Sequence, residues 1–157
     1  DGGSFGNPGP GGYGVVMKYK HHRKELSGAF RKTTNNRMEI LGAIRGLEEL
    51  TEPCKVAVYS DSKYVVNTIS KGWALKWRAN NWVKSNKEIA ANPDLWAILL
   101  DLCDKHEVEF NWVKGHSGDP ENERCDELCK AAGKLPGLPP DTGYEESLVD
   151  SSVSLFA

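Results

Sequence analysis

Four acidic side chains occupy positions where an α/β chain tends to place its chemistry. They are Asp1, Glu39, Asp61 and Asp126. Asp1 precedes a Gly-rich stretch, and Glu39 lies in the first turn of an amphipathic helix. Asp61 follows an apolar strand, and Asp126 lies in the last strongly patterned helix. Ligand sites in such folds gather at the carboxyl ends of parallel strands. Clustered carboxylates repel one another unless a cation shares the site, and their oxygen atoms suit hard divalent ions. The pattern therefore favours a divalent-metal centre.

Each carboxylate also has an ordinary structural explanation. Glu39 follows Asn36 at the spacing of a capping box, and Asp61 directly precedes a helix that it would cap. Asp126 is one of several charges on its helix. Taken singly, these structural roles are favoured over catalysis.

The elements that would position these groups alternate along the chain. Apolar spacing predicts strands at 13–20, 25–30, 55–60 and 107–113, and helices at 37–50, 62–70, 94–106 and 120–134. The first two strands form an antiparallel hairpin, whereas the later strand and helix alternation implies parallel pairing. The expected fold is α/β with a mixed sheet.

Length and composition fit one domain over residues 1–157, since 39% of the 157 residues are hydrophobic. No apolar run approaches the roughly 20 residues of a membrane span, so a soluble, cytoplasmic protein without membrane association is expected. The cysteines (Cys54, Cys103, Cys125 and Cys129) match no disulfide framework and are interpreted as free thiols, with zinc binding as the less favoured alternative.

Charge is unevenly distributed along the chain. The net charge is -2, yet residues 71–87 carry five cationic side chains and no acidic one, and residues 136–157 carry four acidic and no basic ones. The remaining body is slightly cationic, which suits a phosphate ligand locally. The Pro-, Gly- and acid-rich segment 136–150 is predicted to be mobile and to lie on the surface.

Six motifs, taken in order, resemble the bacterial type 1 branch of the ribonuclease H family. They are DGGSFGNPGPGGYG (1–14), TTNNRMEI (33–40), YSDSKYV (59–65), DLW (94–96), VKGHSGDPENERCDELC (113–129) and DTGY (141–144). The resemblance implies a ribonuclease H-like fold with a five-stranded mixed sheet, flanking helices and a basic protrusion. It also implies an endonuclease that hydrolyses the RNA strand of RNA/DNA hybrids and leaves 5′-phosphate and 3′-hydroxyl ends.

By the same resemblance, the four carboxylates hold two Mg²⁺ or Mn²⁺ ions, and His116 assists proton transfer or product release. Asn7, Asn35 and Asn36 match contacts to the RNA strand, and Thr34 matches part of a pocket for a DNA-strand phosphate. Lys63 stands where the bacterial pattern often has Gln, so the resemblance does not decide whether this position contacts the RNA strand.

The segment 72–92 matches the family's basic protrusion. Its candidate substrate contacts are Trp73, Lys76, Trp77, Arg78, Lys84 and Lys87. Without the resemblance, a helix with core tryptophans and a solvated basic face is the favoured explanation.

One feature departs from the family pattern. In the family, the first metal-binding aspartate follows several residues of a strand. Here Asp1 is the first residue of the sequence. Joining residues 153–157 (VSLFA) to Asp1 restores such a strand. We therefore expect residues 151–157 to supply the first strand, either in a circularly permuted chain or in a sequence written out of its covalent order.

Other classes remain open. A hybrid-binding module without catalysis would lack a carboxylate, and none of the four is missing. A reverse-transcriptase domain or a DNA nuclease of the same fold is less favoured by the GPGGYG and TTNNRME segments. A monomer with no obligate protein partner is expected.

Overall fold

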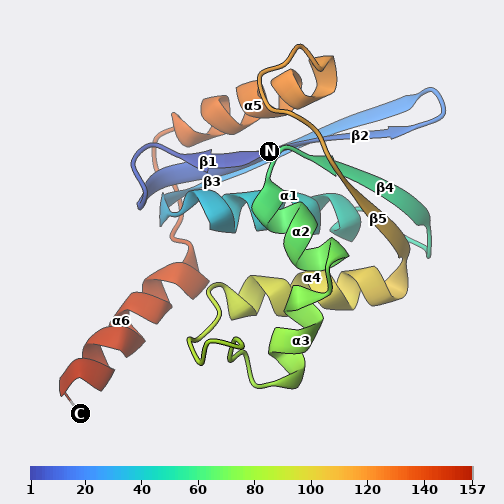
Figure 1. Cartoon of the computed structure of the whole chain (residues 1–157). Coiled ribbons are helices and arrows are strands. Elements are labelled where there is room, and N and C mark those ends of the chain that lie inside the picture. Colours follow the sequence, from blue (N-terminus) through green and yellow to red (C-terminus); the bar gives the residue numbers. More distant parts are fainter. Residues whose placement is uncertain (157) are drawn as a thin grey trace.

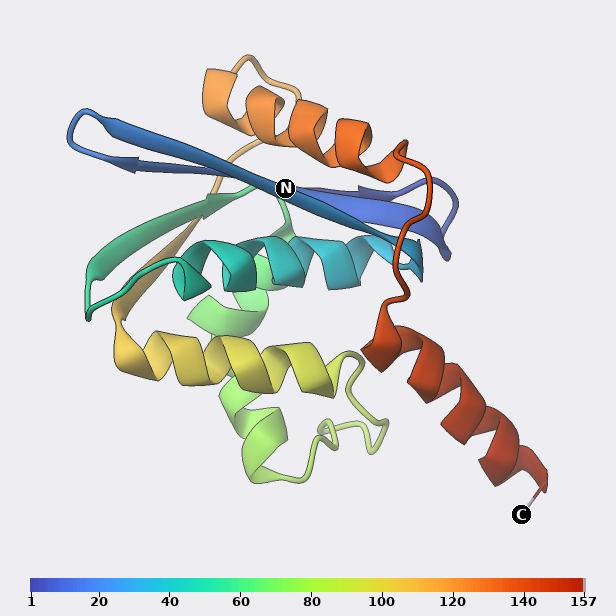
Figure 2. The same ribbon diagram turned by 180° about the vertical axis from the view of Figure 1, so that it is seen from behind.

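The computed structural model describes the backbone of residues 1–156 and the side chains of residues 1–149. The elements form layers, with helix α5 (Pro120–Gly133) on one face of an antiparallel sheet and helix α1 (Asn35–Glu48) on the other (Figure 1 and Figure 2). Helix α4 (Pro93–Lys105) lies beyond α1 as a further layer. This arrangement confirms the α/β class.

The antiparallel sheet contains β1 (Gly2–Ser4), β2 (Gly9–Tyr19) and β3 (His22–Thr33), in that order. Strands β2 and β3 form a hairpin in which Tyr19 pairs with His22. Both strands are longer than the sequence pattern predicted, because glycines that are typical of a loop continue β2 and pair with β3. The hairpin itself is confirmed.

The second pair of strands, β4 (Lys55–Ser60) and β5 (Glu107–Trp112), is parallel as predicted. Helices α2 (Lys63–Ser70), α3 (Trp73–Ala79) and α4 lie in the connection between them. Within residues 1–156 the predicted mixed sheet is divided, because β1 has only three residues and pairs with β2 alone. The antiparallel and parallel groups are therefore held together by packing rather than by a shared ladder.

Helix α1 organises the core. It begins at Thr34, whose hydroxyl accepts a hydrogen bond from the Arg37 N–H at 3.2 Å, a regular helix cap. Met38 and Ile44 are fully buried with Trp96 of α4. Burying each such side chain contributes roughly 1.5 to 3 kcal/mol, so the start of α1 is held firmly against the rest of the protein.

The C-terminal residues form helix α6 (Thr142–Phe156). The prediction that 153–157 completes the first strand is wrong, because residues 153–156 are helical and α6 lies far from Asp1 (Figure 1 and Figure 2). Residue 157 lies outside the described residues. At the start of α6, the Tyr144 N–H donates to the Asp141 carboxylate at 3.3 Å. Once a helix has started, adding further residues to it costs little free energy. The circular-permutation hypothesis loses its structural basis.

The segment 136–150 is anchored most firmly at Asp141. Asp141 is buried, accepts a hydrogen bond from Thr33 Oγ1 at 2.7 Å and pairs with Arg37 Nε at 2.8 Å. Arg37 also pairs with Asp94 of α4 at 2.8 Å. Burial opposes the charge on Arg37, but the two carboxylates outweigh it and raise its pKa. The prediction of a mobile surface segment is therefore wrong at Asp141, which ties the start of α6 to α1.

Two further observations concern membrane spans and cysteines. No helix within residues 1–156 is long and apolar enough to cross a membrane. All four cysteines are free thiols, as predicted.

Candidate active site

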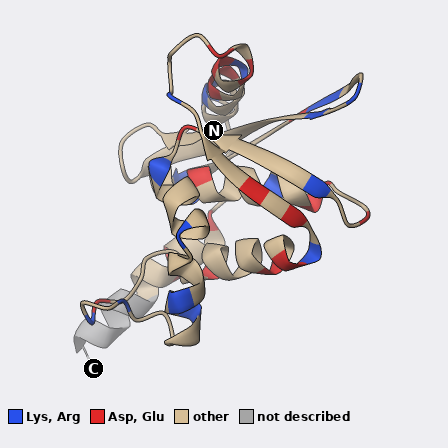
Figure 3. Ribbon diagram, turned by 45° about the vertical axis from the view of Figure 1, so that its right-hand side comes forward, with Lys and Arg blue, Asp and Glu red and all other residues tan. Residues whose placement is uncertain are grey.

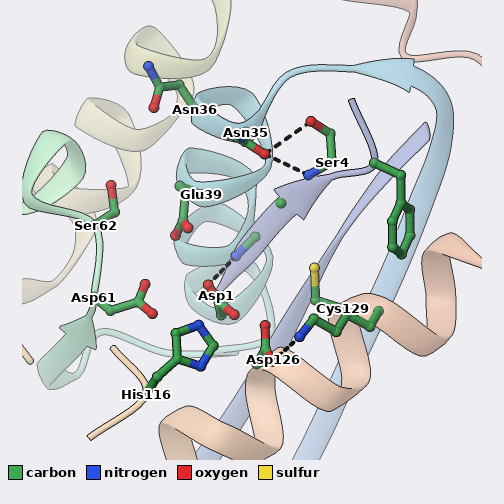
Figure 4. A pocket seen from close by; sticks show the side chains of 14 residues that line it. Asp1, Ser4, Asn35, Asn36, Glu39, Asp61, Ser62, His116, Asp126 and Cys129 are labelled. Carbon is green, nitrogen blue, oxygen red and sulfur yellow. Dashed lines mark hydrogen bonds and ion pairs between the residues drawn. The ribbon is translucent and has the colours of Figure 1, made fainter. Parts of the chain in front are cut away.

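Three of the four candidate carboxylates converge. Asp1, Glu39 and Asp61 each offer a carboxylate oxygen, and these atoms lie within 4.8 Å of one another. They come from the chain before β1, the first turns of α1 and the end of β4, and Figure 4 shows them facing a common space. The space is a pocket of about 380 Å³. This grouping has the donor set and the spacing that a divalent cation requires.

Asp1 reaches Glu39 because β1 lies directly on α1. A Cβ at Gly2 would collide with the backbone of Met38 and Glu39, so only glycine permits this approach. The Asp1 carboxylate accepts a hydrogen bond from the Gly2 N–H at 2.9 Å, which orients it. The close approach thus places two carboxylates side by side.

Glu39 lies in the pocket with a raised pKa. Burial is the largest cause that raises its pKa, to about 7, and the charges of Asp61 and Asp126 raise it further. The Asp1 amino group and the Gly2 N–H oppose the shift. Its Oε2 atom is buried and has no hydrogen-bond partner among the described residues. A buried carboxylate oxygen without a donor is costly, and a cation would satisfy it.

The ordinary explanations for Glu39 and Asp61 do not hold. The cap of α1 is Thr34, so Glu39 is not needed there. The cap of α2 is Ser62, whose hydroxyl accepts from the Val65 N–H at 3.2 Å, so the Asp61 carboxylate is not used as a cap. Both acids remain available to a ligand.

Asp126 lines the same pocket but lies outside the group of three. It comes from α5 and forms an ion pair with Lys130 one helical turn later, at 2.8 Å. The hydrogen bond to Asp126 raises the pKa of Lys130. Lys130 therefore occupies an oxygen of Asp126 that a cation bound to Asp126 would need.

His116 faces the acids from the loop between β5 and α5. The residue is exposed, has a φ of 54° and lines the pocket, and Figure 4 shows its ring turned toward Asp1 and Asp126. An imidazole at this place can carry a proton to or from the pocket.

The candidate RNA contacts lie at the rim near α1. Asn35 and Asn36 line the pocket, and both are exposed. Asn35 Oδ1 accepts from the N–H and the hydroxyl of Ser4 at 2.7 and 3.0 Å. Asn7 is exposed outside the pocket lining, and its Oδ1 accepts from the Asn35 N–H at 3.1 Å. Asn7 therefore binds the backbone of Asn35 and also faces solvent.

The protrusion is α3 together with the loop to α4. Figure 3 shows basic residues on both parts. Trp73 is 38% exposed, whereas Trp77 packs against the hydrophobic core. The packing of Trp77 agrees with the alternative interpretation of a helix with core tryptophans. Arg78 pairs with Asp101 at 3.0 Å and Lys84 lies 4.0 Å from Glu88, so both cations are partly neutralised.

The remaining two cations of the protrusion are fully on its surface. Lys76 in α3 and Lys87 in the loop are both exposed. They are the protrusion side chains best placed to meet a phosphate.

The sequence pattern did not single out every residue of the pocket. Its lining also includes Ser4, Phe5, Ser62, Cys129 and Lys130. Lys130 was detectable, because it follows Asp126 at the i,i+4 spacing of a helical ion pair. Cys129 was not, since its thiol donates to the Gly12 carbonyl at 3.0 Å across more than a hundred residues of sequence.

The fold and the pocket together define a class: an α/β protein whose carboxylates gather at the end of a parallel strand pair, where they could hold a divalent cation. Comparison with known proteins narrows this class. The chain belongs to the ribonuclease H family, whose profile matches residues 1–134. It is therefore a hydrolase of a metal-dependent family.

The relatives agree with this assignment. The chain is 67% identical to a ribonuclease H of Desulforamulus reducens, over 90% of this chain and 89% of the relative. It is 58% identical to a ribonuclease H of Rippkaea orientalis, over 96% and 93% of the two chains.

Solved structures give the same result. The structure of LC9-RNase H1, described as a type 1 RNase H with the type 2 active-site motif, matches with a TM-score of 0.74 at 30% identity, over 93% of this chain and 76% of the other. LC11-RNase H1, solved in complex with an RNA/DNA hybrid, matches with a TM-score of 0.62 at 28% identity, over 84% and 91%.

Proposed function

We propose that the protein is an endonuclease that hydrolyses the RNA strand of RNA/DNA hybrids with the help of two divalent cations and leaves 5′-phosphate and 3′-hydroxyl ends. The observation that carries the proposal is the cluster of three carboxylates, Asp1, Glu39 and Asp61, each of which offers an oxygen within 4.8 Å of the other two. One oxygen of Glu39 is also buried and has no hydrogen-bond partner among the described residues. The solved complex of LC11-RNase H1 with an RNA/DNA hybrid supports the substrate class.

Asp1, Glu39, Asp61 and Asp126 would hold the cations, with Mg²⁺ as the expected ion and Mn²⁺ as its substitute. When bound, such a pair of ions activates a water molecule and stabilises the leaving oxygen of a phosphodiester. Asp126 completes this set by exchanging its ion pair with Lys130 for a cation. The four residues also fix where the scissile phosphate must lie.

His116 moves the proton in this proposal. Its ring faces the carboxylates from an exposed loop, so it can take a proton from the pocket and release it to solvent. No covalent intermediate on the protein is needed.

Recognition of the two strands is assigned to different surfaces. Asn35 and Asn36 at the rim, with Asn7 beside them, would read the ribose 2′-hydroxyl, since an amide both donates and accepts. Thr34, next to Asn35, would contact a DNA-strand phosphate.

The basic protrusion would hold the DNA strand. The side chains assigned to it are Trp73, Lys76, Trp77, Arg78, Lys84 and Lys87. Cations at this place position the nucleic acid without reading its sequence. Because one chain carries all four carboxylates, a monomer is sufficient, and the predicted cytoplasmic location stays a prediction.

The test is cleavage of a hybrid labelled on each strand in turn, with Mg²⁺ or with EDTA, beside duplex DNA and single-stranded RNA. We expect cuts in the RNA strand of the hybrid alone, and none with EDTA or in Asp61→Asn. The matched control is Glu109→Gln, which removes an exposed charge from β5 and should cut normally. Cleavage of duplex DNA at a similar rate would favour the DNA nuclease, and binding without cleavage would favour the hybrid-binding module.

A further inference from the structure

The position of Asp61 depends on the end of β5 and on the loop that follows it. Asp61 comes directly after β4, and the last residue of that strand, Ser60, pairs with Trp112 in the parallel ladder. The Val113 N–H donates to the Ser60 carbonyl at 2.9 Å and extends this pairing by one step. The backbone on either side of Asp61 is thus set by β5 on one side and by α2 on the other.

The first specific contact comes from Trp112. Its indole Nε1–H donates to the backbone carbonyl of Asp61 at 3.1 Å. Trp112 is 45% exposed, so it does not serve mainly as core packing. The Lys63 ammonium group lies over the ring, 4.7 Å from its centroid, and holds it from the α2 side. The indole is therefore fixed in an orientation that fits its hydrogen bond to Asp61.

The second contact comes from Gly115. A Cβ at this position would lie 2.8 Å from Asp61 Oδ2 and 3.4 Å from both its Cβ and its Cγ atoms. The loop backbone therefore packs against the carboxylate itself, and only a residue without a side chain leaves the carboxylate where it is. His116 is the next residue, so the same loop sets the position of the acid and of the imidazole.

We propose that Trp112 and Gly115 are positioning residues for Asp61, which hold its backbone carbonyl and its carboxylate in the arrangement that binds a divalent cation. The inference rests on the proposed function for its catalytic meaning, but its direct consequence is cation affinity. Neither residue touches the cation or the substrate in this role. Gly115 acts by leaving space, and Trp112 acts by one directed hydrogen bond.

The test measures Mn²⁺ binding to the free protein, from the electron paramagnetic resonance signal of unbound Mn²⁺. Trp112→Phe removes the N–H and keeps an aromatic ring, and we expect it to weaken binding roughly two- to tenfold, as for one lost hydrogen bond. Gly115→Ala forces the carboxylate to move and should weaken binding by about tenfold or more. The control is Gly46→Ala in α1, where the nearest atom to a new Cβ is Val15 Cγ1 at 3.3 Å and binding should stay unchanged.

Three further measurements separate positioning from other roles. The unfolding temperature in EDTA should stay close to that of the unmodified protein, the KM for hybrid should be unchanged, and the Mg²⁺ concentration for half-maximal cleavage should rise in step with the loss of Mn²⁺ affinity. Unchanged Mn²⁺ affinity in both variants overturns the inference. A raised KM with normal Mn²⁺ affinity also overturns it, because Trp112 would then be a substrate contact.

The two proposals fail in different ways. If the unmodified protein binds Mn²⁺ but does not cut the hybrid, the proposed function fails, while the Mn²⁺ affinities of the variants still decide the positioning role.

Discussion

Glu39→Gln should stabilise the metal-free protein above neutral pH. Burial raises the pKa of Glu39 from 4.5 to about 7, and one pKa unit corresponds to about 1.4 kcal/mol. A carboxyl group with a raised pKa in the folded state contributes stability below pH 4.5 and loses it as the pH rises through about 7. The buried charge therefore costs up to about 3 kcal/mol at pH 8, and glutamine at this position avoids the cost.

The assay is urea unfolding in EDTA at pH 4, 6 and 8. The difference in unfolding free energy between Glu39→Gln and the unmodified protein should be near zero at pH 4 and grow with pH. Glu48→Gln on the same helix is the control, since that carboxylate is exposed and pairs with Arg45. Millimolar Mg²⁺ should stabilise the unmodified protein but not Glu39→Gln. A difference that is constant from pH 4 to pH 8 would refute the reasoning.

Three other changes have defined outcomes. Arg37→Ala leaves Asp141 buried without its cation and should cost about 3 to 5 kcal/mol in urea unfolding, whereas a cost below 1 kcal/mol would mean that water replaces the arginine. Lys130→Met frees Asp126 and should raise Mn²⁺ affinity roughly twofold; a fall would show that the lysine supports the site. His116→Ala should lower kcat about 100-fold at unchanged Mn²⁺ affinity, and a normal kcat at neutral pH would remove it from proton transfer.

Much of the site could be predicted because short-range sequence patterns indicate the helix and the strand that position its carboxylates. The periodicity of 37–50 located α1, and the apolar stretch 55–60 located the strand that ends at Asp61. The ordinary roles of Glu39 and Asp61 could not be dismissed from sequence, because Thr34 and Ser62 compete for the same caps and only the geometry shows which residue is used.

The C-terminal residues show where local pattern fails. Short apolar alternation in 151–157 suits a strand as well as a helix, and the deciding contact is distant in sequence. Asp141 meets Thr33 and Arg37 across more than a hundred residues, and this pairing sets the start of α6. Long-range ion pairs of this kind leave no periodic signal.

The direction of α6 bears on how the enzyme is handled in the laboratory. The helix leaves the body of the protein and leads away from Asp1, which lines the pocket, so a fluorophore, affinity tag or solid support attached beyond it would lie away from the carboxylates (Figure 2). Because Asp141 and Glu145 tie its first turns to Arg37 and Arg31, tension applied through such an attachment would be transmitted to the start of α1, next to Glu39. A force-sensing experiment on this protein would therefore pull on the helix that carries Glu39.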